Sequence, residues 1–175
     1  MSLLVLAYPL FSAADFRTIQ EFRRAHDRRY YSVVAPHLAL VYPVSDMEPS
    51  AFAAEIRHRL GATRAIDFAL RYAAINKDAF EDLTHVFLIP EEGAGSFVRL
   101  HDRLYAGKLL PQRRLDIDYI PHVGVGNSRD PAECLRLVEQ WNERPFEIRG
   151  TVSALDIVTY ENNSVTTFDR IALGP

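Results

Sequence analysis

Two histidines occupy matching places in the sequence. His37 lies in PHLALVYP, residues 36–43, and His122 lies in PHVGVGNS, residues 121–128. In both segments a proline precedes the histidine, and an apolar, a small and another apolar residue follow it. An imidazole titrates near neutral pH, so one ring can accept a proton while a protonated partner donates one. Two such rings facing each other across a phosphodiester can run an in-line displacement without a metal ion.

Both segments read as β-strands, and strand alternation sets which residues share a face. The two faces that carry the histidines are expected to hold His37, Ala39 and Val41, and His122, Gly124 and Gly126. The opposite faces, which include Tyr42, are expected to enter the core. Each histidine therefore has a very small neighbour on its own face. This pattern predicts that the histidine faces line an open groove.

The similarity continues beyond the strands. SDMEPSAFAAEI follows the first histidine segment and SRDPAECLRLVE follows the second, and each is a short acidic stretch with a proline that starts a helix. The repeat covers about residues 36–60 and 121–145. It predicts two lobes related by a pseudo-twofold axis, with one histidine from each lobe across a central cleft.

Periodicity and turn residues predict the remaining elements. Helices are expected over residues 12–29, 45–61, 95–109 and 130–145. Strands are expected over residues 1–11, 35–44, 66–77, 84–90, 118–128, 146–160 and 165–174. The fold class is therefore α+β, with antiparallel sheets flanked by helices in a single domain over residues 1–175.

Composition limits the function classes. The net charge of −3 gives no general case for nucleic-acid binding by bulk electrostatics, and the single cysteine, Cys134, excludes an intramolecular disulfide. No Lys or Arg precedes Arg17, so a signal peptide is not expected, and the protein is predicted to be cytoplasmic with no membrane contact. No metal-ligand spacing is present, so neither a metal nor a cofactor is expected. The oligomeric state stays open.

Here the sequence resembles the two-histidine (2H) phosphoesterase superfamily, which includes the 2′-5′ RNA ligase group and cyclic phosphodiesterases. The resemblance rests on the two Pro-His strands and on the order of elements along nearly the whole chain, from the first strand to the closing hairpin ending IALG. It implies a bilobal fold in which His37 and His122 form an acid/base pair. The implied substrate is a cyclic or 2′-5′ phosphodiester of a nucleotide or RNA end.

The chain departs from the family at the motif hydroxyls. Ala39 and Gly124 stand where the family has Thr or Ser, whose hydroxyls hold phosphate oxygens. A hydrogen bond to a charged group contributes about 1.5–3 kcal/mol, so losing two without a substitute lowers the rate by roughly two to four orders of magnitude. The alternative function is therefore a catalytically weakened protein that binds nucleotides or RNA.

Lesser signals complete the predictions. Tyr8 and Tyr119 stand near the ends of strands that border the cleft, where either ring could stack on a base. The basic cluster before the first motif, Arg23, Arg24, Arg28 and Arg29, reads as a solvated helix face that could also attract phosphate. The other histidines, His26, His58, His85 and His101, have no repeated context and are expected at the surface or in caps.

Overall fold

The computed structural model describes residues 1–175. Its strands are β1 (Ser2–Ala7), β2 (Leu10–Phe11), β3 (Leu38–Val44), β4 (Ile66–Lys77), β5 (Thr84–Glu92), β6 (Val123–Ser128), β7 (Ile148–Val152), β8 (Ala154–Glu161) and β9 (Ser164–Ala172). Its helices are α1 (Ala13–His26), α2 (Pro49–Leu60), α3 (Ala94–Leu104) and α4 (Pro131–Asn142), with a 3₁₀ helix at Gly107–Gln112. None of the helices is long and apolar enough to cross a membrane.

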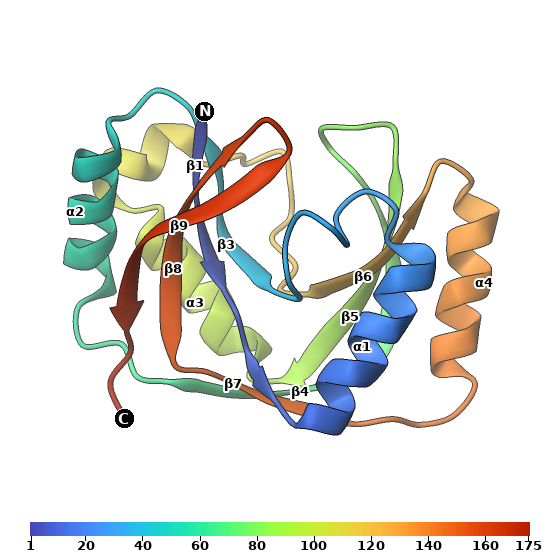
Figure 1. The fold of residues 1–175 in the computed structure, drawn as a ribbon. Helices are drawn as coiled ribbons and strands as arrows, with labels where there is room; N and C mark the ends of the chain where they lie inside the picture. The colour runs from blue at the N-terminus through green and yellow to red at the C-terminus, as the bar shows by residue number, and fades with distance from the viewer.

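Two antiparallel sheets form two lobes, as predicted. The first has the strand order β3-β1-β8-β9 and the second has the order β2-β7-β4-β5-β6. In Figure 1 the first sheet lies on the left and the second on the right, with β3 and β6 on their facing sides. The two histidine strands are therefore edge strands of different sheets, each paired to a central strand.

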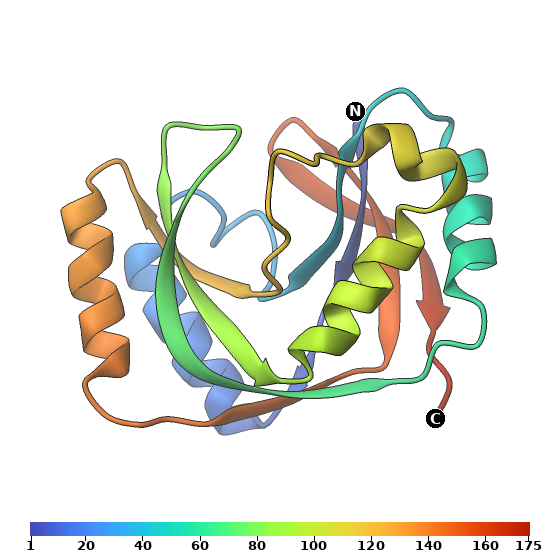
Figure 2. The same ribbon diagram turned by 180° about the vertical axis from the view of Figure 1, so that it is seen from behind.

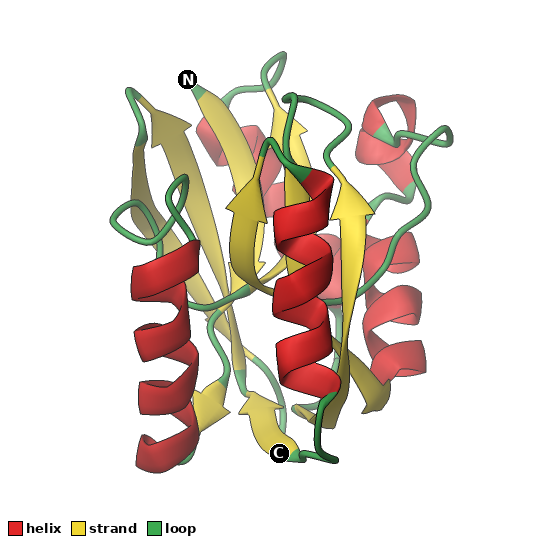
Figure 3. Cartoon of the chain, turned by 90° about the vertical axis from the view of Figure 1, so that its right-hand side faces the viewer, coloured by secondary structure: helices red, strands yellow, loops and turns green.

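The helix that precedes each histidine strand in the chain packs on the sheet of the other histidine strand. Helix α1 precedes β3 in the chain but packs on β6, and α3 precedes β6 but packs on β3. Figure 3 shows α1 and α4 side by side on the outer face of the five-stranded sheet. Figure 2 shows α3 beside α2 in the other lobe. Each half of the chain thus supplies a helix to the sheet that holds the other half's histidine.

Local sequence explains where the helices begin. The Ser12 hydroxyl accepts a hydrogen bond from the Asp15 N–H at 3.1 Å and caps α1. Helices α2 and α4 both have proline at their first position, Pro49 and Pro131, where no intrahelical N–H is required. The second of these is also capped by the Asp130 side chain, which accepts from the Ala132 N–H at 2.9 Å.

Two segments that were each predicted to be one continuous strand form two strands each. The strand expected over residues 1–11 divides into β1 and β2, and the strand expected over 146–160 divides into β7 and β8. Within each pair, one strand belongs to each sheet. Pro9, which has no N–H for a strand ladder, lies at the first division. Because β1 pairs with β8 and β2 pairs with β7, both chain segments cross between the lobes at the same level.

Both histidine strands contain a β-bulge at the same place in the repeat. In β3, Ala39 pairs with Leu6 and Val41 pairs with Val5, so Leu40 is the extra residue. In β6, Gly124 and Gly126 pair with consecutive residues of β5, so Val125 is the extra residue. A bulge breaks the simple alternation of side chains. The predicted repeat therefore extends to the backbone irregularity.

The bulges correct two predicted orientations. Val41 is fully buried in the core and not on the face of His37, whereas Tyr42 lines the cavity between the lobes. In the other strand, a Cβ atom on Gly126 would lie 3.4 Å from the His26 Cβ and 3.5 Å from the Leu137 Cδ1, toward the covering helices. Strand alternation had placed both residues beside their histidines. The inserted residue turns Val41 and the Cβ direction of Gly126 away from the cavity, while the backbone of Gly126 still lines it.

Candidate active site

A cavity of about 280 Å³ lies between the two sheets, and both motif histidines line it. Its wall also includes Ala39 and Gly124, the two small residues that follow the histidines. The strands β3 and β6 thus bring together the four motif positions that the sequence places 85 residues apart. Both histidine side chains are half-buried, which leaves part of each ring accessible from the cavity.

The two imidazoles are held by equivalent hydrogen bonds. His37 Nδ1 lies 2.8 Å from the carbonyl oxygen of Ala35, and His122 Nδ1 lies 2.6 Å from that of Ile120. A carbonyl oxygen can only accept, so Nδ1 of each ring carries the proton. The lone pair of each neutral ring is therefore on Nε2. In each case a proline, with its fixed φ, separates the histidine from the carbonyl and holds this geometry.

Burial lowers the pKa of both histidines. Desolvation is the main cause for His37; the Ala35 carbonyl opposes it, Arg23 lowers the pKa further, and Asp27 raises it. Desolvation lowers the pKa of His122 to about 4, opposed by the Ile120 carbonyl and reinforced by the positive charge that His37 and His85 carry when protonated. At neutral pH these shifts favour the neutral form of both rings. An imidazole can act as an acid only after it is protonated, and a bound anion nearby would favour that protonation.

The cavity wall has open space where the family has a hydroxyl. A Cβ atom built on Gly124 meets no atom within 4 Å, and Ala39 is only half-buried. No side-chain donor of either residue is available to a phosphate oxygen. Polar contacts to any ligand in the cavity would therefore come from the histidines and from groups beyond the motif.

Aromatic rings fix the position of His122. Phe87, on the neighbouring strand β5, stacks on the imidazole with a centroid distance of 3.4 Å and an interplanar angle of 13°. The next ring along β5 is His85, which stacks with Phe87 at a centroid distance of 5.6 Å. Tyr30 lies beyond it at 6.1 Å. All four residues line the cavity.

Neither tyrosine proposed for base stacking is part of the cavity wall. The Tyr8 ring lies near His37, with ring centroids 6.2 Å apart and an interplanar angle of 59°. Tyr119 stacks on His101 at 3.7 Å, and its hydroxyl donates to the Ala39 carbonyl at 3.2 Å. Their stacking role stays a prediction. The tyrosine rings that line the cavity are Tyr30, Tyr42 and Tyr160.

The basic cluster of the sequence separates into residues with different roles. Arg23 is only 1% exposed and pairs with Asp27. The prediction that it lies on a solvated helix face is therefore wrong. Arg29 forms an ion pair with Glu81 at 2.8 Å and donates to the Tyr160 hydroxyl at 3.1 Å. This arginine therefore ties the segment after α1 to both neighbouring hairpins. Arg24 and Arg28 are exposed.

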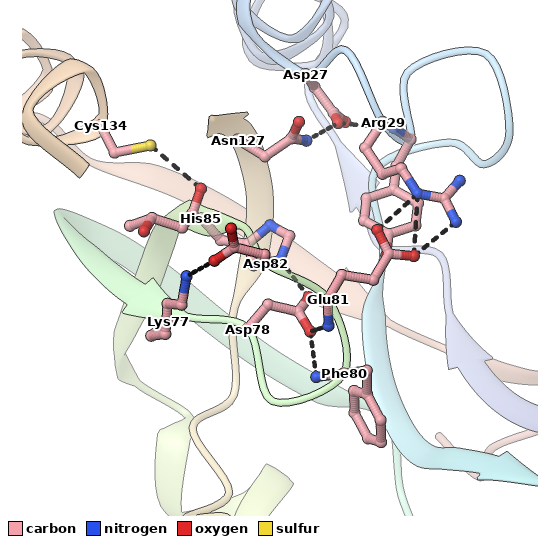
Figure 4. A network of polar contacts seen from close by, with 12 residues as sticks. Asp27, Arg29, Lys77, Asp78, Phe80, Glu81, Asp82, His85, Asn127 and Cys134 are labelled. Atoms are coloured by element: carbon pink, nitrogen blue, oxygen red, sulfur yellow. Dashed lines mark hydrogen bonds and ion pairs between the residues drawn. The ribbon is translucent and has the colours of Figure 1, made fainter. Parts of the chain in front are cut away.

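A polar network in the cavity was missed by the sequence reasoning. His85 is buried, not at the surface, and its Nε2 lies 2.5 Å from the Asp78 carboxylate. Nearby, the Asn127 amide donates to the Asp27 carboxylate at 2.5 Å. Figure 4 shows Asp78 and His85 at the turn that contains Glu81, with Asp27 and Asn127 near them. All four residues line the cavity. No repeat marks these residues in the sequence, and their partners lie 7 and 100 positions away.

His101 and Cys134 also have defined places outside the cavity. His101 is buried and its Nδ1 lies 2.9 Å from the Leu40 carbonyl, which corrects its predicted surface position. This contact secures the bulge of β3 from the side of α3. Cys134 is buried, as expected for a lone structural cysteine, and its thiol donates to the Thr84 carbonyl at 3.2 Å.

Solved structures share this fold. The chain is similar to Escherichia coli LigT complexed with NADP⁺ (TM-score 0.57, 16% identity, 99% of this chain and 98% of that chain covered). It is also similar to TT0787 of Thermus thermophilus (TM-score 0.60, 18% identity, coverage 99% and 98%). Usb1 of Kluyveromyces marxianus matches with a TM-score of 0.59 and 12% identity over 98% of each chain. At these identities the likeness shows the fold alone.

Sequence comparison identifies the family. No curated protein sequence gives a significant match. The sequence profile of the 2'-5' RNA ligase superfamily, by contrast, matches residues 9–164, which include both histidine strands and the bulges that follow them. With its two lobes and its pair of motif histidines on one cavity, the chain belongs to the 2'-5' RNA ligase superfamily of two-histidine phosphoesterases.

Proposed function

We propose that this protein is a phosphoesterase that hydrolyses a cyclic or 2′-5′ phosphodiester of a nucleotide or RNA end, with His37 and His122 as the acid/base pair. The observation that carries the proposal is the placement of both imidazoles on one cavity, each with Nε2 as the available nitrogen. Membership of a superfamily of phosphoesterases supports the reaction class.

The proposed reaction needs one neutral and one protonated ring. The neutral imidazole accepts a proton at Nε2 from water as the water oxygen forms a bond to phosphorus. The P–O bond to the leaving oxygen breaks, and the protonated imidazole donates its Nε2 proton to that oxygen. A 2′,3′-cyclic phosphate thereby becomes a monophosphate, with both rings exchanging roles. Burial lowers the pKa of both rings and so disfavours their protonated state. The negative charge of the bound phosphodiester acts in the opposite direction and favours protonation of one ring.

A second candidate function is supported by the motif positions. Ala39 and Gly124 provide no hydroxyl to the phosphate, and the space next to Gly124 is open. A protein that keeps the cavity and histidines but stabilises the transition state poorly would bind a nucleotide and turn it over slowly or not at all. This candidate is a nucleotide- or RNA-binding protein of the same fold.

Hydrolysis of nucleoside 2′,3′-cyclic phosphates in the presence of a chelator tests the proposal. We expect turnover by the wild-type protein and a loss of about 10²- to 10⁴-fold in kcat for both His37→Ala and His122→Ala, because each removes a general acid or base. His58→Ala is the matched control, since His58 is exposed on α2. Its kcat is expected to equal that of the wild type.

The outcomes separate the two candidates. Turnover that is unchanged in either motif variant would contradict two-histidine catalysis. A folded wild-type protein that binds adenosine 2′-monophosphate without hydrolysing any cyclic or 2′-5′ phosphodiester would favour the binding function. Thermal unfolding of each variant shows that a loss of activity is not a loss of fold.

A further inference from the structure

We propose that the cavity selects a compact ligand with one phosphate group and an apolar or aromatic body, and discriminates against nucleotides that carry a second phosphate. This inference rests on the proposed function and narrows its substrate class. It follows from the charges and the apolar surface that surround the two histidines.

Both permanent cations that line the cavity are already paired. The Arg23 guanidinium donates to the Asp27 carboxylate at 3.0 Å, to the Gln20 side chain at 2.9 Å, and to the carbonyls of Tyr30 and Val34 at 3.2 and 2.8 Å. Lys77, the other cation, lies 2.6 Å from an Asp82 carboxylate oxygen. A second phosphate would have to compete with carboxylates for either of them. The hydrogen-bonding groups of Arg23 are therefore occupied, and Lys77 would have to leave Asp82 to contact a phosphate.

Carboxylates exceed cations on the cavity wall. Asp27, Asp78 and Asp118 all line it, whereas Arg23 and Lys77 are its only Arg or Lys residues. Asp118 is exposed and forms no ion pair. A phosphate added to a substrate would therefore meet an excess of negative charge in a partly desolvated space.

Asp78 is held as an anion at one end of the cavity. Burial raises its pKa, but hydrogen bonds from His85 and from the backbone N–H groups of Phe80 and Glu81 more than offset this, so its pKa is lowered. The two N–H groups lie 2.6 and 2.8 Å from Oδ1. Figure 4 shows this carboxylate between the turn and the His85 ring. A phosphate group near His85 would be placed against a fixed negative charge.

The rest of the wall is largely apolar. Of the 27 residues that line the cavity, 14 are hydrophobic, among them Leu6, Phe87 and Ile120. Ala39 and Gly124 add methyl and backbone surface where the family has hydroxyls. Apolar walls with few polar groups are typical of sites that enclose a small ligand. This surface fits a nucleobase or another apolar body next to a single phosphodiester.

An adjoining hollow offers an alternative site for the second phosphate of a longer nucleotide. It is lined by residues that include Arg28, Arg29 and Arg129, and it shares Asn127 with the cavity. Arg29 is paired with Glu81, and Arg28 lies 3.9 Å from Glu133. Arg129 is exposed and is the residue through which this hollow would hold a second phosphate. The experiment below therefore includes its removal.

Calorimetric titration with two related probes tests the inference independently of turnover. The probes are adenosine 2′-monophosphate and adenosine 2′,5′-bisphosphate, which differ only in the added 5′-phosphate. We expect the bisphosphate to bind wild-type protein roughly threefold to thirtyfold more weakly at low salt, because like charges repel in the cavity. Salt of about 1 M should reduce the difference, since it screens the repulsion.

Two substitutions of an aspartate by asparagine identify the source of the discrimination. Asp78→Asn removes the fixed charge at the end of the cavity and should bring the two affinities closer together. Asp46→Asn changes the net charge by the same amount at an exposed position outside the cavity and should leave their ratio unchanged. Unfolding curves of both variants confirm that they are folded.

Several results would overturn the inference. Tighter binding of the bisphosphate would do so, as would a selective loss of its affinity in Arg129→Ala, which would place a second phosphate in the adjoining hollow. Binding of neither probe would also overturn it. The proposed function is decided separately by chelator-resistant turnover, so failure of one conclusion is distinguishable from failure of the other.

Discussion

At the scale of single residues, the two motif histidines are buried enough to be neutral and close enough to the cavity to react. Their burial disfavours the charged form, and a bound anion would offset this effect. Binding of a negatively charged ligand should therefore raise the pKa of one or both rings. The lowered pKa values also affect the pH dependence of folding stability, which can be measured without any substrate.

Acid should destabilise the folded protein through these residues. The pKa of His122 is about 4 in the folded protein and 6.5 ordinarily, so below pH 6.5 the unfolded chain binds a proton that the folded chain does not. The free energy of unfolding should therefore fall as the pH decreases from about 6.5 toward 4, by about 2 kcal/mol at pH 5 from this residue. His37, whose pKa is also lowered, contributes in the same direction.

Urea unfolding at pH 7 and pH 5 checks this prediction. The matched variant is His122→Phe, which keeps an aromatic ring against Phe87 but cannot titrate. We expect it to lose about 2 kcal/mol less stability than the wild type between the two pH values. Equal losses in the two proteins would show that His122 is not held neutral by the fold.

Restoring the motif hydroxyls should increase activity. Gly124→Ser places a side chain where no atom lies within 4 Å, so we expect normal folding. A recovered hydrogen bond to the phosphate should raise kcat about 10-fold to 100-fold if it acts in the transition state. Ala39→Thr should act in the same direction. Gly124→Ala, which adds the Cβ without the hydroxyl, is the control, and an equal effect of Ala and Ser would refute the prediction.

At the scale of elements, the end of α1 and the segment that leads to β3 depend on one buried arginine. Arg23 joins the helix to Asp27 and to two backbone carbonyls of the segment before His37. Arg23→Ala should destabilise the protein by about 3–5 kcal/mol, because it leaves Asp27 as an uncompensated buried charge.

Arg24→Ala is the natural comparison for this substitution. Arg24 is the next residue of the same helix, is exposed, and forms no ion pair. We expect its free energy of unfolding in guanidinium chloride to stay within about 0.5 kcal/mol of the wild type. Similar effects of the two substitutions would mean that Arg23 does not hold this segment.

The sequence predicts the helices and strands better than it predicts which strands pair with one another. The four helices and the hairpin of β4 and β5 follow from caps, prolines and alternation, which are local. The divisions at Pro9 and at Ser153 do not, because the sheet that each strand joins is decided by distant partners. The bulge after Ala39 has the same origin, since the pairing with β1 creates it.

The site shows the same limit. His37 and His122 are recognisable because their context is repeated within one chain. The pair of Asp78 and His85 has no such mark, and only the fold of the hairpin brings the two side chains within 2.5 Å. The buried state of Arg23 is likewise invisible in a sequence that shows only a basic cluster.

At the scale of the whole molecule, the exchange of strands and helices should make the two lobes unfold together. Each sheet contains strands from both halves of the chain. Trp141, the single tryptophan, lies on α4 and reports on the five-stranded lobe. Leu40 is fully buried in β3 of the other lobe.

Leu40→Ala tests this coupling. The substitution should lower the free energy of unfolding by about 2–5 kcal/mol. If the lobes unfold as one unit, the Trp141 fluorescence transition shifts by the same amount as the far-ultraviolet circular dichroism transition. A fluorescence transition that stays at the wild-type denaturant concentration would show that the lobes are independent.

The paired bulges also decide how the specificity of this cleft can be redesigned. Counting by twos from either histidine selects Val41 and Gly126 for randomisation, although Val41 is fully buried and a Cβ atom on Gly126 would point toward His26 and Leu137. A combinatorial library that follows the real geometry varies positions 39, 42, 124 and 127, which line the cavity. Such a library varies side chains that can contact a ligand. One built on simple alternation would instead place new side chains against the packed interior.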